Sequence, residues 1–554
     1  MAIERNGRTA LITKQIRAIA CATAVLAALC TVLLACGHRD PGQPERTLRR
    51  GLGGDVSTFD PQKAADNFSE DVIRDLFEGL TSETPDGGAI PALAESWSVA
   101  DDGKTYTFEL RRMARWSNGD EVTADDVVAG IQRGLDPSVA SPAAALLRPI
   151  EHAADVINGT LSPKSLGVVA NGPHTLVIHL SHATPYFPML LARCIAFPIH
   201  RSSLQRLGDR FATPANLVSN GPYRLEAFTP STKVSLIRNP YYWDSPRVSV
   251  ERVEHYPIAD APAQLLRYRA NDLDMTSTIP AARFDWARRE MGQELQIRPQ
   301  LAVVYLAFNL ESGPLSRAAR LREALSLSID RESLTAQVLR SGQVPAYSFV
   351  PPGIPDYTPA SYSWQLEARE SRRARARALY RDSGFSEASP LKLRLLYSDD
   401  EAFRSTAVTA AAAWKEVLGI DVELRQREFK TYLTERTDRR SWDVAVSGWG
   451  ADFQDPSNFL EVFRSNSASN DPGLTDSEYD NLLDAAESEP RGVNRLRLLE
   501  LAERRLIDSH AITPVYHPVL RRLVKPYVRG AMLNPMGHNY SKSLALTQSA
   551  MVRR

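Results

Sequence analysis

The strongest constraint on this chain lies at its start, where a basic segment precedes a long apolar run. Residues 18–35 carry no charge and are rich in Ala, Leu and Val, and four basic residues come before them: Arg5, Arg8, Lys14 and Arg17. This arrangement is typical of an export signal that is removed from the mature protein. We therefore expect the rest of the chain to fold outside the cytoplasm.

The apolar run ends in Leu33-Leu34-Ala35-Cys36, which resembles the bacterial lipobox, where the cysteine takes up lipid and becomes the new N-terminus. Residues 1–35 would then be a lipoprotein signal peptide, and residues 36–46 a flexible tether. The alternative is an uncleaved anchor helix, since about 20 apolar residues span a bilayer. We expect a periplasmic protein held to a membrane by lipid at Cys36. The sequence does not decide between the inner and the outer membrane.

Cysteine usage and length bear on how the mature chain is stabilised. Of four cysteines, Cys21 and Cys30 leave with the signal peptide and Cys36 carries lipid, so Cys194 has no partner for an internal disulfide. Residues 36–554 exceed the usual ~100 to 200 per domain, so two or more lobes should share the apolar content. Loss of the leader leaves a net charge of about minus three, which gives no sign of a nucleic-acid surface.

The remaining pattern mixes helices and strands. Helical spacing of apolar residues occurs over residues 124–135, 317–339, 368–380, 406–417 and 478–508. Strand-like runs occupy residues 104–110, 391–397, 420–425 and 442–447. The alternation from residue 391 onward predicts an α/β lobe with largely parallel strands.

The sequence shows no sign of catalysis. It contains no nucleophile elbow, zinc-type histidine pair or phosphate-binding loop. Its one crowd of histidines has a spacing that fits turns and strand ends better than a metal shell: His152, His174, His179 and His182. We therefore expect no catalytic residue, no metal and no cofactor, and we interpret the chain as a binding protein rather than an enzyme.

Several motifs follow one another in a fixed order. They are residues 91–97 (PALAESW), 102–111 (DGKTYTFELR), 116–119 (WSNG), 122–127 (VTADDV), 220–223 (NGPY) and 238–243 (RNPYYW). Together they resemble the large extracellular solute-binding proteins of ABC transporters, the family of oligopeptide and dipeptide receptors. The resemblance covers nearly all of the chain after the tether.

The resemblance implies an α/β periplasmic-binding-protein fold with two lobes, a hinge and an additional subdomain, which closes over its ligand. On this chain lobe I would combine residues 47–80, 202–301 and 532–554, the subdomain would be 81–201, and lobe II would be 302–531. The hinges would lie near Leu301 and Ala531. The implied function is that of a monomeric substrate-binding lipoprotein of an ABC importer, which captures peptides and delivers them to permease subunits in the membrane.

The prediction that the ligand is a peptide depends chiefly on Asp452. It matches the aspartate that takes the ligand's α-ammonium group in the oligopeptide receptors. A closed cleft strengthens such a charge-assisted hydrogen bond, and a free N-terminus is the one cation that every peptide carries. The alternative is that Asp452 caps a helix starting near Pro456, or simply sits in a turn.

The resemblance also marks further ligand-binding candidates. Trp449 would offer an aromatic face to a ligand side chain, and Gly448 and Gly450 would let a backbone approach closely; core packing is the alternative for Trp449. A second pocket stretch would contribute Phe429 and Arg436. The loop 63–69 would pair with the peptide as an added strand, with Asn67 acting through its main chain.

Other positions depart from the family's ligand-contacting residues: Val446, Ala143, Gln300 and Phe403. We therefore expect the far end of the pocket to suit peptides of different length or chemistry, or a modified peptide. Two alternatives stay open. One is a receptor of the same fold for a nickel chelate, an oligosaccharide or a cell-wall fragment, and the other is a lipoprotein that senses peptides rather than importing them.

Overall fold

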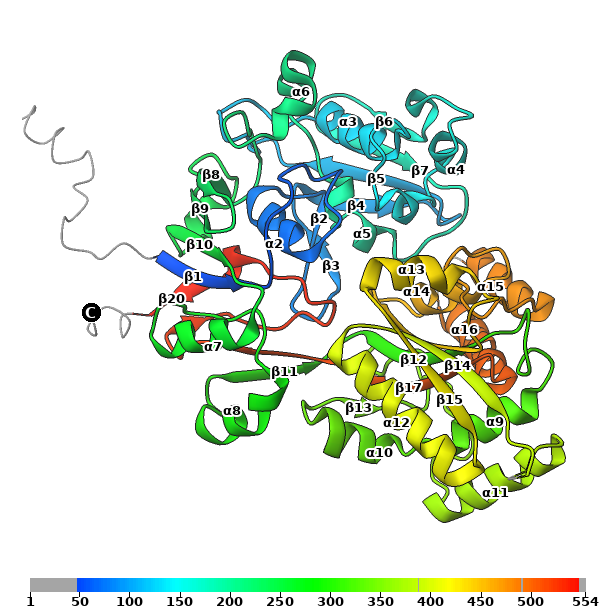
Figure 1. Cartoon of the computed structure of the whole chain (residues 1–554). Helices are drawn as coiled ribbons and strands as arrows, with labels where there is room; N and C mark the ends of the chain where they lie inside the picture. The colour runs from blue at the N-terminus through cyan, green and yellow to red at the C-terminus, as the bar shows by residue number, and fades with distance from the viewer. Residues whose placement is uncertain (1–46, 387, 490–491, 548–554) are drawn as a thin grey trace, which may run out of the picture. The chain divides into compact units, whose positions relative to one another are not determined.

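The computed structural model describes residues 47–386, 388–489 and 492–547. The predicted signal peptide (residues 1–35), the lipidation site Cys36 and the tether (residues 36–46) lie outside the described residues. The described chain contains three larger sheets (Figure 1), which we name the β1 sheet, the β5 sheet and the β12 sheet after one strand of each.

The β1 sheet has four strands in the order β1, β10, β9 and β8. They are β1 (Thr47–Leu52), β8 (Tyr223–Thr229), β9 (Lys233–Arg238) and β10 (Arg252–Pro257). β1 runs parallel to β10, and the other pairs are antiparallel. Helix α2 (Asn67–Leu76) follows β1, and the Asp66 side chain caps it by accepting a hydrogen bond from the Ser69 backbone N–H. This cap fixes the helix that carries Glu70 and Arg74 one turn apart.

The β5 sheet is antiparallel and has the order β4, β5, β7 and β6. Its strands are β4 (Ala94–Val99), β5 (Thr105–Leu110), β6 (Val168–Ala170) and β7 (Thr175–His179). Helix α3 (Ala124–Leu135) packs beside it and begins with a capping box formed by Thr123 and Asp126. The strand predicted at 104–110 and the helix predicted at 124–135 are confirmed. The β5 sheet shares one hydrophobic core with the β1 sheet.

The β12 sheet has six strands in the order β13, β17, β12, β16, β14 and β15. They are β12 (Ala302–Phe308), β13 (Val344–Pro345), β14 (Lys392–Ser398), β15 (Asp421–Arg427), β16 (Val444–Gly450) and β17 (Ile512–His517). Every residue of β12 is buried, as expected of an inner strand that is covered on both faces. This sheet has its own hydrophobic core.

The prediction of largely parallel strands is correct for part of this sheet only. β14 runs parallel to both β15 and β16, and helices α12 (Glu401–Leu418) and α13 (Phe429–Thr437) make the crossovers. β12 is antiparallel to its neighbours β16 and β17. The three strands predicted from residue 391 onward are thus parallel to one another, as expected, and the antiparallel β12 comes from earlier in the chain, outside the pattern on which that prediction rested.

Helix positions largely agree with the periodicity, but two predicted helices are interrupted. Residues 317–339 contain α9 (Ala319–Ser328) and then α10 (Arg331–Ser333), which Asp330 caps through the Ser333 backbone N–H. Residues 478–508 contain α15 (Ser477–Ser488) and α16 (Val493–Ser509). The helix predicted at 368–380 is α11 (Arg369–Asp382).

Two strands join the β12 sheet to the rest of the described chain. β11 (Leu295–Pro299) leads into β12, β18 (Val519–Leu523) follows β17, and the two pair antiparallel with each other. Leu523, Val524 and Val528 pack in clusters with residues of the β1 side, not with the β12 core. The predicted lobe boundaries stay a prediction. This packing favours a second crossing, from lobe II back to lobe I, near Pro518 rather than near Ala531.

Candidate functional site

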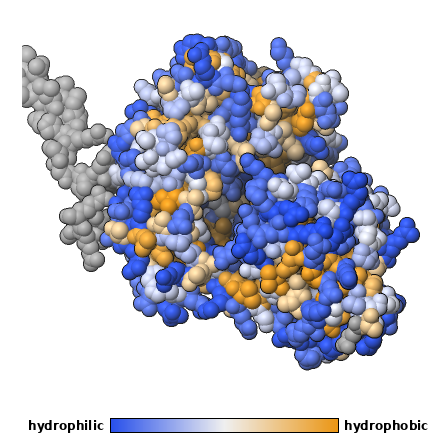
Figure 2. All heavy atoms as spheres, viewed as in Figure 1, coloured by the Kyte–Doolittle hydropathy of each residue, from blue (hydrophilic) through white to orange (hydrophobic). Residues whose placement is uncertain are grey.

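A cavity of about 580 Å³ opens between the β12 sheet and the part of the chain that carries the β1 and β5 sheets. One side is formed by residues between 64 and 70, residues between 142 and 146, and Arg193; the other is formed by residues between Trp449 and Ser469. Figure 2 shows a hollow on this face between α2 and α13. The volume lies within the usual range of about 300 to 1,000 Å³ for a small-ligand pocket.

Asp452 lies two residues beyond the end of β16 and lines this cavity. The first four residues of β16 are buried and its last, Gly450, is exposed, so the chain leaves the sheet here. The Asn458 amide oxygen accepts hydrogen bonds from the Trp449 indole N–H (3.1 Å) and the Asp452 backbone N–H (3.3 Å). This turn presents a carboxylate whose side chain is 36% exposed.

Asp455, not Asp452, is the acid that serves the following helix. Its Oδ1 accepts from the Ser457 backbone N–H (2.9 Å) at the start of α14 (Ser457–Leu460), and Arg495 binds both of its carboxylate oxygens at 2.8 and 2.9 Å. The alternative in which Asp452 caps this helix is therefore wrong. Asp452 does sit in a turn, with its carboxylate left for the cavity.

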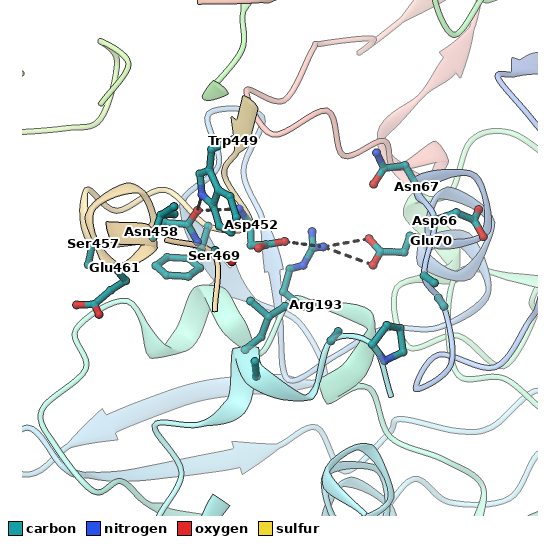
Figure 3. A pocket seen from close by; sticks show the side chains of 18 of the residues that line it. Asp66, Asn67, Glu70, Arg193, Trp449, Asp452, Ser457, Asn458, Glu461 and Ser469 are labelled. Atoms are coloured by element: carbon teal, nitrogen blue, oxygen red, sulfur yellow. Dashed lines mark hydrogen bonds and ion pairs between the residues drawn. The ribbon is translucent and has the colours of Figure 1, made fainter. Parts of the chain in front are cut away.

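Arg193 lies between two carboxylates in the cavity (Figure 3). Its Nη2 is 3.2 Å from Glu70 Oε2 and 3.4 Å from Asp452 Oδ1. Both distances exceed the ~2.8 Å typical of a charge-assisted hydrogen bond. Arg193 thus links the two acids across the cavity and pairs tightly with neither.

Buried groups behind Arg193 hold it in place. Arg74 Nη2 lies 2.5 Å from Glu70 Oε2, Arg193 Nη1 donates to His538 Nε2, and His538 Nδ1 lies 2.8 Å from Glu83. Burial, aided by the charge of Arg74, lowers the pKa of His538 to about 4. The imidazole is therefore neutral at pH 7, so its Nδ1–H donates to Glu83 while Nε2 accepts from Arg193.

The acids of this group differ in how well they are compensated. Burial raises the pKa of Asp452; the Arg193 guanidinium opposes this rise and the Glu70 charge adds to it. Burial also opposes ionisation of Glu70 and Glu83. Arg74 and Arg193 hold the pKa of Glu70 below its ordinary value, and the contact with His538, followed by the same two arginines, does so for Glu83. Asp452 is thus the carboxylate that gains most from an added cation.

The structure brings three predicted residues to the cavity and leaves others away from it. Asp452, Trp449 and Asn67 line it. Gly448 and Gly450 belong to β16, and a Cβ at Gly450 would meet nothing within 4 Å, so packing does not require glycine there. Asn67 is the first residue of α2 rather than part of an extended loop. A ligand that added a strand here would therefore have to pair with the residues that precede Asn67.

Phe429 and Arg436 lie on α13, and neither lines the cavity. Phe429 is 53% exposed and stacks on Tyr432. Arg436 donates to Ser447 Oγ (3.0 Å) and lies 3.1 Å from Asp471. Both side chains are occupied by local contacts within the β12 side.

The positions that depart from the family's ligand-contacting residues also differ in whether they line the cavity. Ala143 lines the cavity. Val446 is fully buried inside β16 and Phe403 packs against Tyr432, so neither side chain lines the cavity. Gln300 does not line this cavity either, so of the four departures Ala143 is the one that borders it.

Sequence reasoning missed Arg193, Glu70 and His538. Arg193 is the only charged residue in the apolar stretch 187–199, and a lone charge in such a stretch signals a buried, partnered group. That signal does not name its partners, which lie 123, 259 and 345 residues away in the chain.

A second contact beside the cavity also joins the two sides. The Tyr186 ring stacks on Phe453 with centroids 4.5 Å apart, and the Arg495 guanidinium lies 5.5 Å from the centre of the Tyr186 ring. Phe453 belongs to the hydrophobic core of the β1 and β5 sheets although it follows β16 in the chain. The segment after β16 is therefore anchored on both sides of the cavity.

Among the described residues, no three His, Cys, Asp or Glu side chains are grouped so as to hold a metal ion. Within the same residues, no helix has the length and apolar character to cross a membrane.

The family model for bacterial extracellular solute-binding proteins, family 5, matches residues 88–471. The chain belongs to this family. The solute-binding protein is 35% identical to the periplasmic oligopeptide-binding protein OppA of Salmonella typhimurium over 90% of its own length and 92% of the relative's. It is 34% identical to the probable deoxycholate-binding periplasmic protein YgiS of Escherichia coli, covering 91% and 94% of the two chains.

Its structure resembles that of the periplasmic murein tripeptide-binding protein MppA in the unliganded open form. The TM-score is 0.80 at 33% identity, with 92% of this chain and 99% of that chain covered. The predicted two-lobed α/β fold of the large peptide-binding type is confirmed.

Proposed function

We propose that this solute-binding protein captures peptides by seating their α-ammonium group on Asp452 and then delivers them to the permease of an ABC importer. The observation that carries the proposal is the Asp452 carboxylate, which faces a ligand-sized cavity and whose ion pair with Arg193 has a long distance of 3.4 Å. An ammonium group there gains a charge-assisted hydrogen bond to a carboxylate that is partly buried. The oligopeptide-binding and murein tripeptide-binding relatives support the same ligand class.

The charge of the site also separates peptides from other ligands that this fold can host. A neutral oligosaccharide brings no cation to Asp452, and a bile-acid anion such as deoxycholate adds a carboxylate beside Asp452 and Glu70. With either ligand, the Asp452 carboxylate, whose pKa burial raises, would gain no cation to stabilise its charged form.

The test is calorimetric titration of wild-type and Asp452→Asn proteins with Ala-Ala-Ala and with its N-acetylated form. We expect the wild type to bind only the free peptide, and Asp452→Asn to lose at least about tenfold in affinity, since a charged partner is removed. Glu461→Gln is the matched control because Glu461 lines the same cavity but pairs with Arg464 at 2.7 Å. Equal affinity for free and acetylated peptide would refute the assignment.

We further propose that the protein is exported and anchored by lipid at Cys36. The leader and the Leu33-Leu34-Ala35-Cys36 motif support this. In cells, the mature protein should fractionate with membranes and carry the mass of a diacylated N-terminal cysteine. Cys36→Ser should release it, and an unchanged membrane fraction for that variant would contradict lipid anchoring.

A further inference from the structure

One connected network of ionisable side chains surrounds Arg193. Its members are joined by the hydrogen bonds and ion pairs described above: Glu70, Glu83, Asp452, Arg74, Arg193 and His538. The Arg193 guanidinium can only donate, so His538 Nε2 must accept and the imidazole carries a single proton, on Nδ1. Three carboxylates therefore face two guanidinium groups. The network is one positive charge short when all the carboxylates are ionised.

The acids and bases just outside this network balance one another. Arg50 lies 3.4 Å from Asp75. Asp71 touches the network, since it lies 3.4 Å from Arg74 Nη1, but Asn539 also connects it to Arg522 by hydrogen bonds of 3.1 and 2.7 Å, and Arg522 adds a positive charge that offsets it. Lys542 pairs with Glu78 at 2.7 Å. The shortage of one positive charge therefore belongs to the group around Arg193 and is not cancelled nearby.

Asp66 and Glu461 also line the cavity, but both carboxylates are already in use. Asp66 caps α2 and accepts from Ser57 and Ser69, and Glu461 pairs with Arg464. Asp452 and Glu70, on either side of Arg193, are therefore the acids that a cationic ligand group would meet.

We propose that Arg193 determines how many positive charges the amino end of a ligand is allowed to carry, and that this number is one. The inference rests on the proposed function, since it assumes that an ammonium group binds at Asp452. One ammonium completes the network and leaves it neutral. A second cation close to the first finds only Glu70, which Arg74 and Arg193 already compensate, and it meets the Arg193 guanidinium, so it is repelled.

The geometry requires the second charge to be near. An ammonium seated on Asp452 Oδ1 shares that oxygen with Arg193 Nη2, which is 3.4 Å from it. The side chain of the ligand's first residue starts one carbon away from the ammonium nitrogen. A short cationic side chain at that residue therefore keeps its charge within one side-chain length of the ammonium group that sits beside Arg193.

Removing the charge of Arg193 reverses the argument. In Arg193→Gln, three carboxylates would face Arg74 alone, and the network would accept two ligand cations instead of one. Arg193→Lys keeps the charge and serves as the matched control. Arg193 is thus assigned as the residue that sets the charge preference of the site, while Asp452 makes the contact.

The test compares two tripeptides that differ by one group: norleucine-Ala-Ala and ornithine-Ala-Ala, in which a terminal methyl becomes an ammonium group. Titrations at pH 6.5 keep both ornithine amines protonated. We expect the wild type and Arg193→Lys to bind the norleucine peptide at least about tenfold more tightly. In Arg193→Gln this preference should shrink by at least about tenfold or reverse.

The wild-type ratio decides the matter even if Arg193→Gln fails to fold. Equal affinity of the wild type for the two peptides, or tighter binding of the ornithine peptide, overturns the inference and leaves peptide binding intact. A preference that stays within about twofold in a folded Arg193→Gln protein overturns it as well. No binding of either peptide by the wild type would instead refute the proposed function.

Discussion

Two acid–arginine pairs lie close together at the segment after β16, and they are built differently. Asp455 and Arg495 form a buried pair with two contacts of 2.8 and 2.9 Å. Asp452 and Arg193 share one contact of 3.4 Å, and Arg193 is divided between Asp452 and Glu70. The first pair is complete by itself, whereas the second has room for another cation.

The difference shows how a structural acid and a ligand-binding acid can be told apart three residues from each other. Asp455 also accepts from Ser457, so its charge is fully compensated within the chain. Asp452 has a raised pKa and borders the cavity. Incomplete pairing, more than burial or position, marks the acid that awaits a partner.

The comparison predicts its largest effect at Arg495. Arg495→Met would leave the buried Asp455 charge unpaired and should lower the free energy of unfolding by about 3 to 5 kcal/mol. Urea denaturation followed by circular dichroism measures this. Arg440→Ala removes an exposed pair with Asp438 and should leave the denaturation midpoint unchanged; equal effects of the two variants would break the distinction.

Peptide affinity should fall as the solution is acidified. Because burial raises the pKa of Asp452, the carboxylate takes up a proton before an ordinary aspartate does, and that proton competes with the ligand's ammonium group. Arg193 opposes this protonation and Glu70 favours it. Below the raised pKa we expect a loss approaching about tenfold per pH unit.

Titrations at pH 7, 6, 5 and 4.5 check this pH dependence, with Asp452→Asn as the control whose weak residual binding should not vary with pH. An affinity that is flat over this range in the wild type would show that Asp452 does not titrate against the ligand.

Tyr186 should contribute a smaller effect through its stack on Phe453. Tyr186→Leu keeps an apolar side chain but loses the aromatic pair, which is worth about 0.5 to 1.5 kcal/mol. The denaturation midpoint should fall slightly, and further substitution at Phe453 should then cost less than it does in the wild type. Additive losses in this double-mutant cycle would show that the stack contributes nothing specific.

The smallest effect is expected at the two predicted residues that the structure places on α13. Phe429→Ser and Arg436→Lys should leave the affinity for Ala-Ala-Ala within about twofold of the wild type, because neither side chain lines the cavity. A tenfold loss in either variant, measured by the same titration, would show that the substituted residue does contribute to peptide binding.

What the sequence could predict depended on how far apart the interacting residues lie. The helix at 124–135 and the strand at 104–110 follow from local periodicity. The antiparallel place of β12 and the position of Arg193 depend on partners more than a hundred residues away. Asp452 could be predicted because a continuous motif carries it, and it does line the cavity. Its network, in contrast, joins residues from α2, the segment before η3 (Cys194–Ala196) and the loop near His538.

The pairing of β11 with β18 has a consequence for recognition. Two strands bonded side by side bend as one ribbon, so they permit rotation about a common axis and resist independent sliding. Closure of the two sides about this ribbon would return Asp452 to the same neighbour, Arg193, on the opposite wall. A paired connection of this kind would therefore reproduce the same arrangement of Arg193 Nη2, Asp452 Oδ1 and Glu70 Oε2 for every ligand that binds.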